Sequence, residues 1–230
     1  MSAKGRGAHR GGDVDYYPTP AWCVDRLLDN CGEWLLSAVH EALEPTVGDG
    51  AIVRAVDAWC ARTGRREPSW TGVELRTGAL DSRTRLSRHV EGVDFRVWSQ
   101  SVSYRFDLCI GNPPFHLFES IARSAIEASH VTALLLRVSV LESEERIDFW
   151  RTVGRDVALR VLPQRPSFDG EGTDSCAYAW FVWGHPQIRG VEVLDSTPIA
   201  VRNAQKPGAL VVDPRQRSLF AGVSDKGEAA

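Results

Sequence analysis

The sequence predicts an α/β protein with a doubly wound, mostly parallel sheet and an antiparallel edge. Apolar segments of strand length alternate with amphipathic segments of helix length over most of the chain, which is typical of parallel sheets. Two late strand-like segments, Val157–Leu162 and Cys176–Trp183, have no long crossover between them, and this favours the antiparallel edge. The 230 residues are 43% hydrophobic, which is enough apolar material for one core of this kind.

The elements can be assigned in chain order. The first helix is expected to begin at Thr19–Pro20, with Thr19 as its N-cap and Pro20 at the first helical position. A strand is expected to end near Leu43–Glu44, a turn to span Thr46–Gly50, and the next helix to end at Gly64. The other expected elements are strands at Trp70–Leu75, Val90–Phe95, Phe106–Ile110, Val131–Leu141 and Val191–Leu194, and helices at Leu80–His89, Phe118–Ala128 and Glu142–Val153.

Composition excludes several classes of protein. A net charge of -3 excludes a surface that is basic all over, although it is compatible with a local basic patch. The five cysteines are scattered and form no C-x-x-C pair, which favours a reducing cytoplasm over a disulfide scaffold or a zinc knuckle. The histidines follow no metal-ligand spacing, so no metal site is expected. No apolar run reaches the roughly 18 residues of a membrane span.

Three regions are predicted along the chain. Residues 1–14 are rich in Gly and Arg and poor in apolar residues, which predicts a disordered basic arm. Residues 15–185 form the main domain, and residues 186–230 form a short C-terminal extension with a flexible polar tail.

Glycines and carboxylates follow the ends of the predicted strands, where open α/β sheets bind ligands. Gly48 and Gly50 allow a tight turn and a close approach of the backbone to a ligand, although the third glycine of a dinucleotide fingerprint is absent. Glu74 ends the second strand, where an acid accepts hydrogen bonds from ribose hydroxyls. Asp94 follows the third strand, where a carboxylate can accept a hydrogen bond from an adenine amino group. Each of these residues, taken alone, also fits an ordinary strand end.

The segment Asn112-Pro113-Pro114-Phe115 after the strand Phe106–Ile110 is more specific. Two prolines fix the backbone and remove two donors, so the carbonyls of Asn112 and Pro113 are directed away from the sheet. The Asn112 side chain and the ring of Phe115 stand beside them. A rigid cluster of acceptors next to an aromatic ring suits a planar substrate that carries an -NH₂ group.

The chain resembles the S-adenosylmethionine-dependent amino-methyltransferases, specifically the DNA adenine-N6 group. The segments that carry this resemblance are Tyr17–Pro20, Glu44–Gly50, Gly72–Leu75, Val93–Phe95, Asp107–Phe115 and Arg165–Phe168. They cover residues 15–185, which the resemblance therefore identifies as a methyltransferase domain. The Asn-Pro-Pro-Phe segment is typical of enzymes that methylate a planar nitrogen, and the N-terminal Tyr-x-Thr-Pro segment favours DNA adenine as the target.

The resemblance implies a Rossmann-like methyltransferase fold and S-adenosylmethionine as the cofactor. The implied cofactor-binding residues are Tyr17, Thr19, Glu44, Gly48, Gly50, Glu74, Asp94 and Asn112. The methionine end of the cofactor would lie by Thr19, Glu44 and the glycine turn. Its ribose would lie by Glu74 and its adenine by Asp94.

The implied catalytic residues are Asn112, Pro113 and Phe115. The Asn112 side-chain oxygen and the Pro113 carbonyl would accept the two N–H bonds of an adenine that has left the DNA duplex. These bonds would direct the nitrogen lone pair towards the methyl group. Phe115 would cover one face of the base. Phe168 is the candidate for the other face, although a core position in a hairpin explains this residue equally well.

Three alternatives stay open. The segment Asn112–His116 is also similar to ribosomal-RNA guanine-N2 methyltransferases, so an RNA adenine or guanine could be the target. A protein glutamine N5-methyltransferase shares the Asn-Pro-Pro element but usually carries Tyr at the position of Phe115. A catalytically inactive cofactor- or nucleic-acid-binding module is a third reading, against which the intact Asn112 cluster argues.

The C-terminal tail holds one further motif. Gln216, Leu219 and Phe220 resemble the short peptides that dock on bacterial sliding clamps. Packing of Leu219 and Phe220 against the sheet is the competing explanation.

The resemblance as a whole predicts a bacterial or phage-borne enzyme, with or without a restriction partner.

Overall fold

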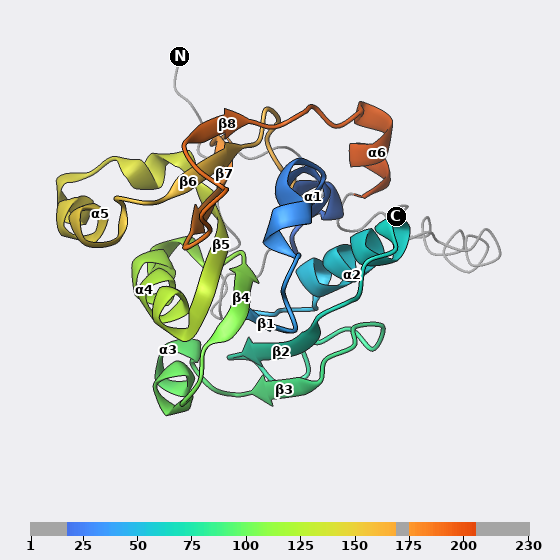
Figure 1. The fold of residues 1–230 in the computed structure, drawn as a ribbon, viewed down its shortest axis with the longest axis horizontal. Coiled ribbons are helices and arrows are strands. Elements are labelled where there is room, and N and C mark those ends of the chain that lie inside the picture. Colours follow the sequence, from blue (N-terminus) through green and yellow to red (C-terminus); the bar gives the residue numbers. More distant parts are fainter. Residues whose placement is uncertain (1–17, 169–174, 206–230) are drawn as a thin grey trace, which may run out of the picture.

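The computed structural model describes residues 18–168 and 175–205, and it confirms the predicted fold: one mostly parallel sheet with helices on both faces (Figure 1). The predicted arm at residues 1–14, the cofactor candidate Tyr17 and the clamp-peptide residues Gln216, Leu219 and Phe220 lie outside the described residues. None of the helices in the described ranges is long and apolar enough to cross a membrane.

The strands are β1 (Glu41–Glu44), β2 (Ser69–Glu74), β3 (Arg88–Glu91), β4 (Phe106–Gly111), β5 (Ser129–Arg137), β6 (Ala158–Val161), β7 (Tyr178–Trp183) and β8 (Val191–Val193). The α-helices are α1 (Ala21–Leu35), α2 (Ala51–Thr63), α3 (Phe95–Trp98), α4 (Phe118–Ala128), α5 (Ile147–Val153) and α6 (Ile199–Ala204). Four 3₁₀ turns complete the described ranges: η1 (Ser99–Ser101), η2 (Phe115–Leu117), η3 (Val138–Leu141) and η4 (Glu144–Arg146).

The strand order within the described residues is β3-β2-β1-β4-β5-β7-β6-β8. β7 runs antiparallel to both of its neighbours, β5 and β6, while the other pairs are parallel. The order reverses between β1 and β4, so the carboxyl ends of these two strands form the topological switch point, where ligands bind in open sheets.

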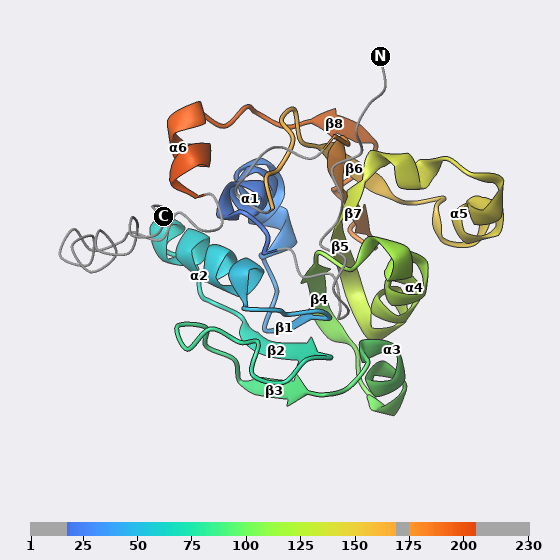
Figure 2. The same ribbon diagram turned by 180° about the vertical axis from the view of Figure 1, so that it is seen from behind.

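The helices form two layers. Helices α1, α2 and α6 lie on one side of the sheet and α3, α4 and α5 on the other, which Figures 1 and 2 show from opposite directions. α1 buries an apolar stripe that includes Trp22, Leu27 and Leu28, and the Nε1 of Trp180 in β7 donates to the Cys23 carbonyl at 2.8 Å. The described residues form three buried apolar clusters to which strands of the sheet contribute.

The prediction of a helix at Leu80–His89 is wrong. The Asp81 carboxylate accepts the backbone N–H of Arg83 at 2.8 Å and also pairs with the Arg83 guanidinium, while the Asp81 carbonyl accepts the Thr84 N–H at 2.9 Å. Such local bonds compete with helical hydrogen bonding, so the segment forms a turn instead. The third strand consequently lies at Arg88–Glu91, earlier than predicted.

Other boundaries also differ from prediction. Thr19 is not an N-cap, because Pro20 holds that position without a side-chain bond and the Thr19 hydroxyl bonds elsewhere. The strand predicted at Val131–Leu141 ends at Arg137, where the chain tightens into η3. Helix α6 lies where a polar tail was expected, and β8 pairs with β6.

We expect the stability of the fold to depend on the protonation of Asp57 in α2. Trp70 in β2 donates its Nε1 to the Asp57 carboxylate at 2.9 Å, yet burial raises the pKa of Asp57 from 3.8 to about 6. The folded chain therefore binds this proton more tightly than the unfolded chain, and stability falls as the pH rises from about 4 to about 6. Asp57→Asn keeps an acceptor for Trp70 and removes the charge.

In urea titrations, the Asp57→Asn variant should gain stability over the wild type at pH 7.5 and lose that advantage below pH 4. Asp148→Asn on the exposed side of α5 serves as the control for the removal of a surface carboxylate. A pH-independent difference between Asp57→Asn and the wild type would contradict the assigned cause.

Candidate functional site

The candidate site lies at the carboxyl ends of β1, β2 and β4. Glu44 and Glu74 are the last residues of β1 and β2, and Asn112 directly follows β4. Because these strands are parallel neighbours in the order β2-β1-β4, their ends meet at one edge of the sheet. The structure therefore brings together the residues that were predicted from separate segments.

The turn after β1 depends on two glycines with positive φ, +56° at Gly48 and +80° at Gly50. A Cβ at Gly50 would lie 2.3 Å from the Thr84 Cγ2, so this position excludes any side chain on steric as well as conformational grounds. The Thr84 hydroxyl donates to the Asp49 carbonyl between these glycines at 2.9 Å. The loop that contains Thr84 thus packs directly onto the turn.

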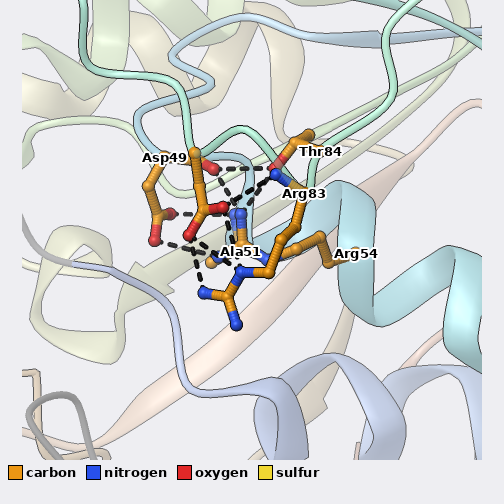
Figure 3. A network of polar contacts seen from close by, with 6 residues as sticks. Asp49, Ala51, Arg54, Arg83 and Thr84 are labelled. Carbon is orange, nitrogen blue, oxygen red and sulfur yellow. Dashed lines mark hydrogen bonds and ion pairs between the residues drawn. The ribbon is translucent and has the colours of Figure 1, made fainter. Parts of the chain in front are cut away.

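Arg54 in α2 fixes the same turn from the other side (Figure 3). Its Nη2 lies 2.9 Å from the Asp49 Oδ2, and its Nη1 donates to both the Asp49 carbonyl and the Thr84 hydroxyl. The Asp49 Oδ1 in turn accepts the Ala51 N–H at 3.0 Å at the beginning of α2. This network determines the shape of the glycine turn before any ligand binds.

Glu44 is a buried carboxyl with one unsatisfied oxygen. The residue is 3% exposed, and among the described residues its Oε2 has no hydrogen-bond partner. Burial raises the pKa of Glu44 well above its ordinary value, and the nearby charge of Asp49 acts in the same direction. An unpaired buried acceptor is costly, and a cationic or N–H-bearing ligand would satisfy it.

Glu74 is buried, and both of its carboxylate oxygens accept hydrogen bonds within the chain. Its Oε2 accepts the Gly48 N–H at 2.8 Å, while its Oε1 accepts the backbone N–H and the Nε of Arg76 at 3.0 and 2.8 Å. Burial alone would raise the pKa of Glu74, but the bonds from Arg76 and Gly48 outweigh it and hold the pKa below its ordinary value. The predicted ribose acceptor is therefore an ionised carboxylate that also orders the glycine turn.

Asp94 caps helix α3 and pairs with Arg96. Its Oδ1 accepts the Arg96 backbone N–H and Nε, each at 2.9 Å, and this pairing lowers the pKa of Asp94. The Val93 N–H donates to the Glu74 carbonyl at 3.4 Å, so Asp94 follows a segment that is bonded to the end of β2. Its role towards adenine stays a prediction.

Asn112 and Thr19 form the polar centre of the site. The Asn112 Nδ2 donates to the Thr19 hydroxyl at 3.0 Å, and the buried Asn112 Oδ1 accepts no hydrogen bond from the described part of the chain. The Pro114 carbonyl accepts the Leu117 N–H that closes η2, which leaves the Pro113 carbonyl out of that turn. Thr19, predicted as a cofactor ligand, thus also orients the Asn112 amide.

The aromatic part of the site is a cluster that the sequence did not predict as a unit. The Phe115 ring lies 5.7 Å from the Tyr178 ring, centroid to centroid, and the Phe168 ring lies 5.3 Å from the same tyrosine. The Arg137 Cζ stands over the Phe115 ring at 4.1 Å from its centroid. Phe168 is 7% exposed and belongs to the core that covers the α1 face, which favours its core role over base stacking.

Several arginines of the site were missed. An acid followed two residues later by arginine occurs at Glu74, Asp81 and Asp94, and these three pairs form ion pairs in the structure. The same spacing at Glu144 gives no such pair, since Arg146 pairs with Glu119 instead, so the spacing alone does not predict Arg76 and Arg96. The described residues contain no cluster of acidic, histidine or cysteine side chains that could hold a metal ion.

Comparison with known proteins shows which fold the chain has. No protein-family model and no curated protein matches the chain. A solved structure from Listeria monocytogenes, assigned as a class I S-adenosylmethionine-dependent methyltransferase, matches with a TM-score of 0.61 and 11% identity, over 84% of this chain and 70% of that one.

Two further solved structures match at similar identity. The methyltransferase subunit of a type I restriction-modification system from Streptococcus thermophilus has a TM-score of 0.55 and 13% identity, over 83% of this chain and 52% of that one. A protein from Pyrococcus horikoshii assigned as an RNA methyltransferase has a TM-score of 0.50 and 14% identity, over 76% of this chain and 89% of that one. The chain therefore has the Rossmann-like fold of these methyltransferases, and it spans about half the length of the type I subunit.

We expect Gly50→Ala to destabilise the protein far more than Gly64→Ala. Both glycines have positive φ, +80° and +69°, so both substitutions carry a conformational cost of about 1 kcal/mol. Nothing lies within 4 Å of a Cβ at Gly64, whereas a Cβ at Gly50 collides with Thr84. Denaturant unfolding should show a loss at least ~1 kcal/mol larger for Gly50→Ala. Equal losses would mean that the turn and the Thr84 loop are not packed as described.

Proposed function

We propose that the chain is an S-adenosylmethionine-dependent methyltransferase that acts on the N6 amino group of adenine in DNA. The observation that carries the proposal is the buried, unsatisfied Asn112 Oδ1, held in place at the carboxyl end of β4 by the bond from its own amide nitrogen to Thr19. An acceptor in this position suits a substrate amino group, and no donor of the described residues bonds to it.

The described residues fit the cofactor. Glu44 Oε2 is a buried acceptor without a partner, which suits the ammonium group of the methionine end. The glycine turn is set by Arg54 and Asp49, and Glu74 Oε2 accepts one bond and has capacity for a ribose hydroxyl. When bound, S-adenosylmethionine supplies an electrophilic methyl group.

The chemistry assigned to the chain is positioning and hydrogen bonding. An aromatic amine is a poor nucleophile because its lone pair is delocalised into the ring. Acceptance of its two N–H bonds by the Asn112 Oδ1 and the Pro113 carbonyl would favour a pyramidal nitrogen with a directed lone pair, which is electrostatic preorganisation. Phe115 would hold the plane of the base. The two acceptors stand on a proline-fixed segment, so little reorganisation is needed at the moment of transfer.

DNA is favoured as the substrate by the Tyr17–Pro20 segment and by fold neighbours that are subunits of type I restriction-modification systems. RNA is the alternative, supported by the segment Asn112–His116 and by the fold neighbour assigned as an RNA methyltransferase. A protein glutamine substrate is less well supported, because Phe115 replaces the usual tyrosine.

One experiment tests the proposal and the RNA alternative together. The protein is expressed in a bacterium that lacks DNA methylation, and the genome is sequenced with detection of modified bases. N6-methyladenine at a recurrent sequence is the expected result. Unmodified DNA together with newly methylated ribosomal RNA would replace the proposal by the RNA alternative. No modification in either nucleic acid would contradict both.

We expect Asn112→Ala to abolish methylation while S-adenosylmethionine still binds within a few-fold of wild type. Loss of one preorganised acceptor should cost on the order of 3 kcal/mol or more in the transfer step, a rate loss of 100-fold or greater. Single-turnover transfer of a labelled methyl group measures the rate, and calorimetry measures cofactor affinity. Transfer at near wild-type rate would remove Asn112 from the mechanism.

We expect cofactor affinity to rise with pH through the ionisation of Glu44. Its pKa is raised by burial, so at low pH the carboxyl is protonated and cannot pair with the ammonium group. Calorimetry across the pH range in which the protein stays folded should show tighter binding at higher pH. Glu44→Gln should bind about 10- to 100-fold more weakly at the upper end of that range and lose the trend. Glu41→Gln, an exposed residue at the beginning of β1, is the control. Identical pH profiles for Glu44→Gln and wild type would place the ammonium group elsewhere.

A further inference from the structure

We infer that Arg137 occupies the place of the target base on Phe115 in the ligand-free chain, and that base entry exchanges this guanidinium for the base while Arg137 moves to a neighbouring phosphate. The inference rests on the proposed function and adds a residue that selects nucleotides within a polynucleotide.

The first observation is the closeness of the stacking contact. The Arg137 Cζ lies 4.1 Å from the Phe115 ring centroid, whereas the four other arginine–aromatic contacts of the described residues span 5.1 to 5.8 Å. A guanidinium is planar and delocalised and stacks on an aromatic face much as a base does. The face of Phe115 that Arg137 covers is therefore not open to a base in this conformation.

The second observation is that Arg137 is anchored at this position. Its Nε donates to the Tyr178 hydroxyl at 3.1 Å, and Tyr178 is fully buried and also contacts the Phe115 ring. Arg137 and Tyr178 are directly paired residues of the antiparallel strands β5 and β7. The guanidinium thus has a defined resting place that is built from two strands.

The third observation concerns access to the acceptor. The Asn112 Oδ1 is buried as well as unsatisfied, so a substrate amino group cannot reach it without a movement of the chain. Arg137 stands over the ring that immediately follows the Asn-Pro-Pro segment, and its side chain is only partly buried. Displacement of this side chain would expose the face of the ring that it covers.

The destination of the displaced guanidinium follows from its chemistry. Arginine binds phosphate through paired N–H donors, and a nucleotide that has left a duplex keeps its flanking phosphates. A phosphate would offset the lost contacts to Phe115 and Tyr178. A free nucleoside would offer no such partner, so the exchange favours a base that belongs to a polynucleotide.

The test uses the full chain and the DNA substrate that the genome experiment identifies. Two quantities are measured: the inhibition constant of deoxyadenosine against methyl transfer, and the dependence of DNA affinity on salt concentration. In Arg137→Ala, the deoxyadenosine inhibition constant should fall several-fold because the guanidinium no longer covers this face of the ring. The slope of log affinity against log salt should decrease in magnitude by about one, because one phosphate contact is lost.

Tyr178→Phe tests the exchange at Phe115 separately from the movement of Arg137 to a phosphate. It removes one acceptor of Arg137, the Tyr178 hydroxyl, but keeps the guanidinium, so deoxyadenosine should inhibit more strongly while the salt slope stays at the wild-type value. This variant also tests the exchange at Phe115 if Arg137→Ala fails to fold. Arg88→Ala is the matched control, because Arg88 covers the Trp98 ring at 5.5 Å and lies at the amino end of β3, away from the site. It should change neither quantity.

An unchanged or higher inhibition constant in both Arg137→Ala and Tyr178→Phe would overturn the exchange at Phe115. An unchanged salt slope in Arg137→Ala would overturn the movement to phosphate. Either result, with methyl transfer intact in the wild type, leaves the proposed function standing. Absence of methyl transfer in the wild type is instead the failure of the proposed function itself, and the inference fails with it.

Discussion

The hydrogen bond from the Asn112 Nδ2 to the Thr19 hydroxyl, 3.0 Å long, is the interaction on which the site depends. It joins the residue after β4 to the segment before α1 and fixes which end of the amide is satisfied. With the nitrogen bonded to Thr19, the Asn112 oxygen is left as a buried acceptor without a partner among the described residues. Such a group costs about 1 to 3 kcal/mol, so the fold must hold it in place against relaxation.

The sheet and the helices hold Asn112 in place. β4 is a central strand between β1 and β5, and α1 buries its apolar stripe against the same core that includes Leu108 and Ile110. A Cβ on Gly111 would lie 2.9 Å from the Pro45 Cδ, so the chain before Asn112 passes in contact with the turn that follows Glu44. The glycine turn and the Asn112 segment are thereby fixed relative to each other, as the proposed methyl transfer between two bound molecules would require.

The parts of the fold that the sequence predicted are those determined by local pattern. Helix α4 matches its predicted range of Phe118–Ala128, and the strand before Asn112 was readable because an apolar run meets two prolines. The helix predicted at Leu80–His89 failed because the bonds of Asp81 to its own neighbours compete with helical hydrogen bonds. The contact of Arg137 with Phe115 depends on the pairing of β5 with β7, 41 residues apart, and no local pattern encodes that pairing.

Single-turnover methyl transfer by Thr19→Val and Thr19→Ser shows whether Thr19 acts by orienting the Asn112 amide. Serine retains the hydroxyl, and valine keeps the shape of threonine without it. We expect a transfer rate close to wild type for Thr19→Ser. For Thr19→Val we expect a loss of about tenfold or more, of the order of one hydrogen bond to a buried group, with cofactor affinity changed by no more than a few-fold. A Thr19→Val variant that transfers at the wild-type rate would contradict this role of Thr19, as would one whose loss lies entirely in cofactor affinity.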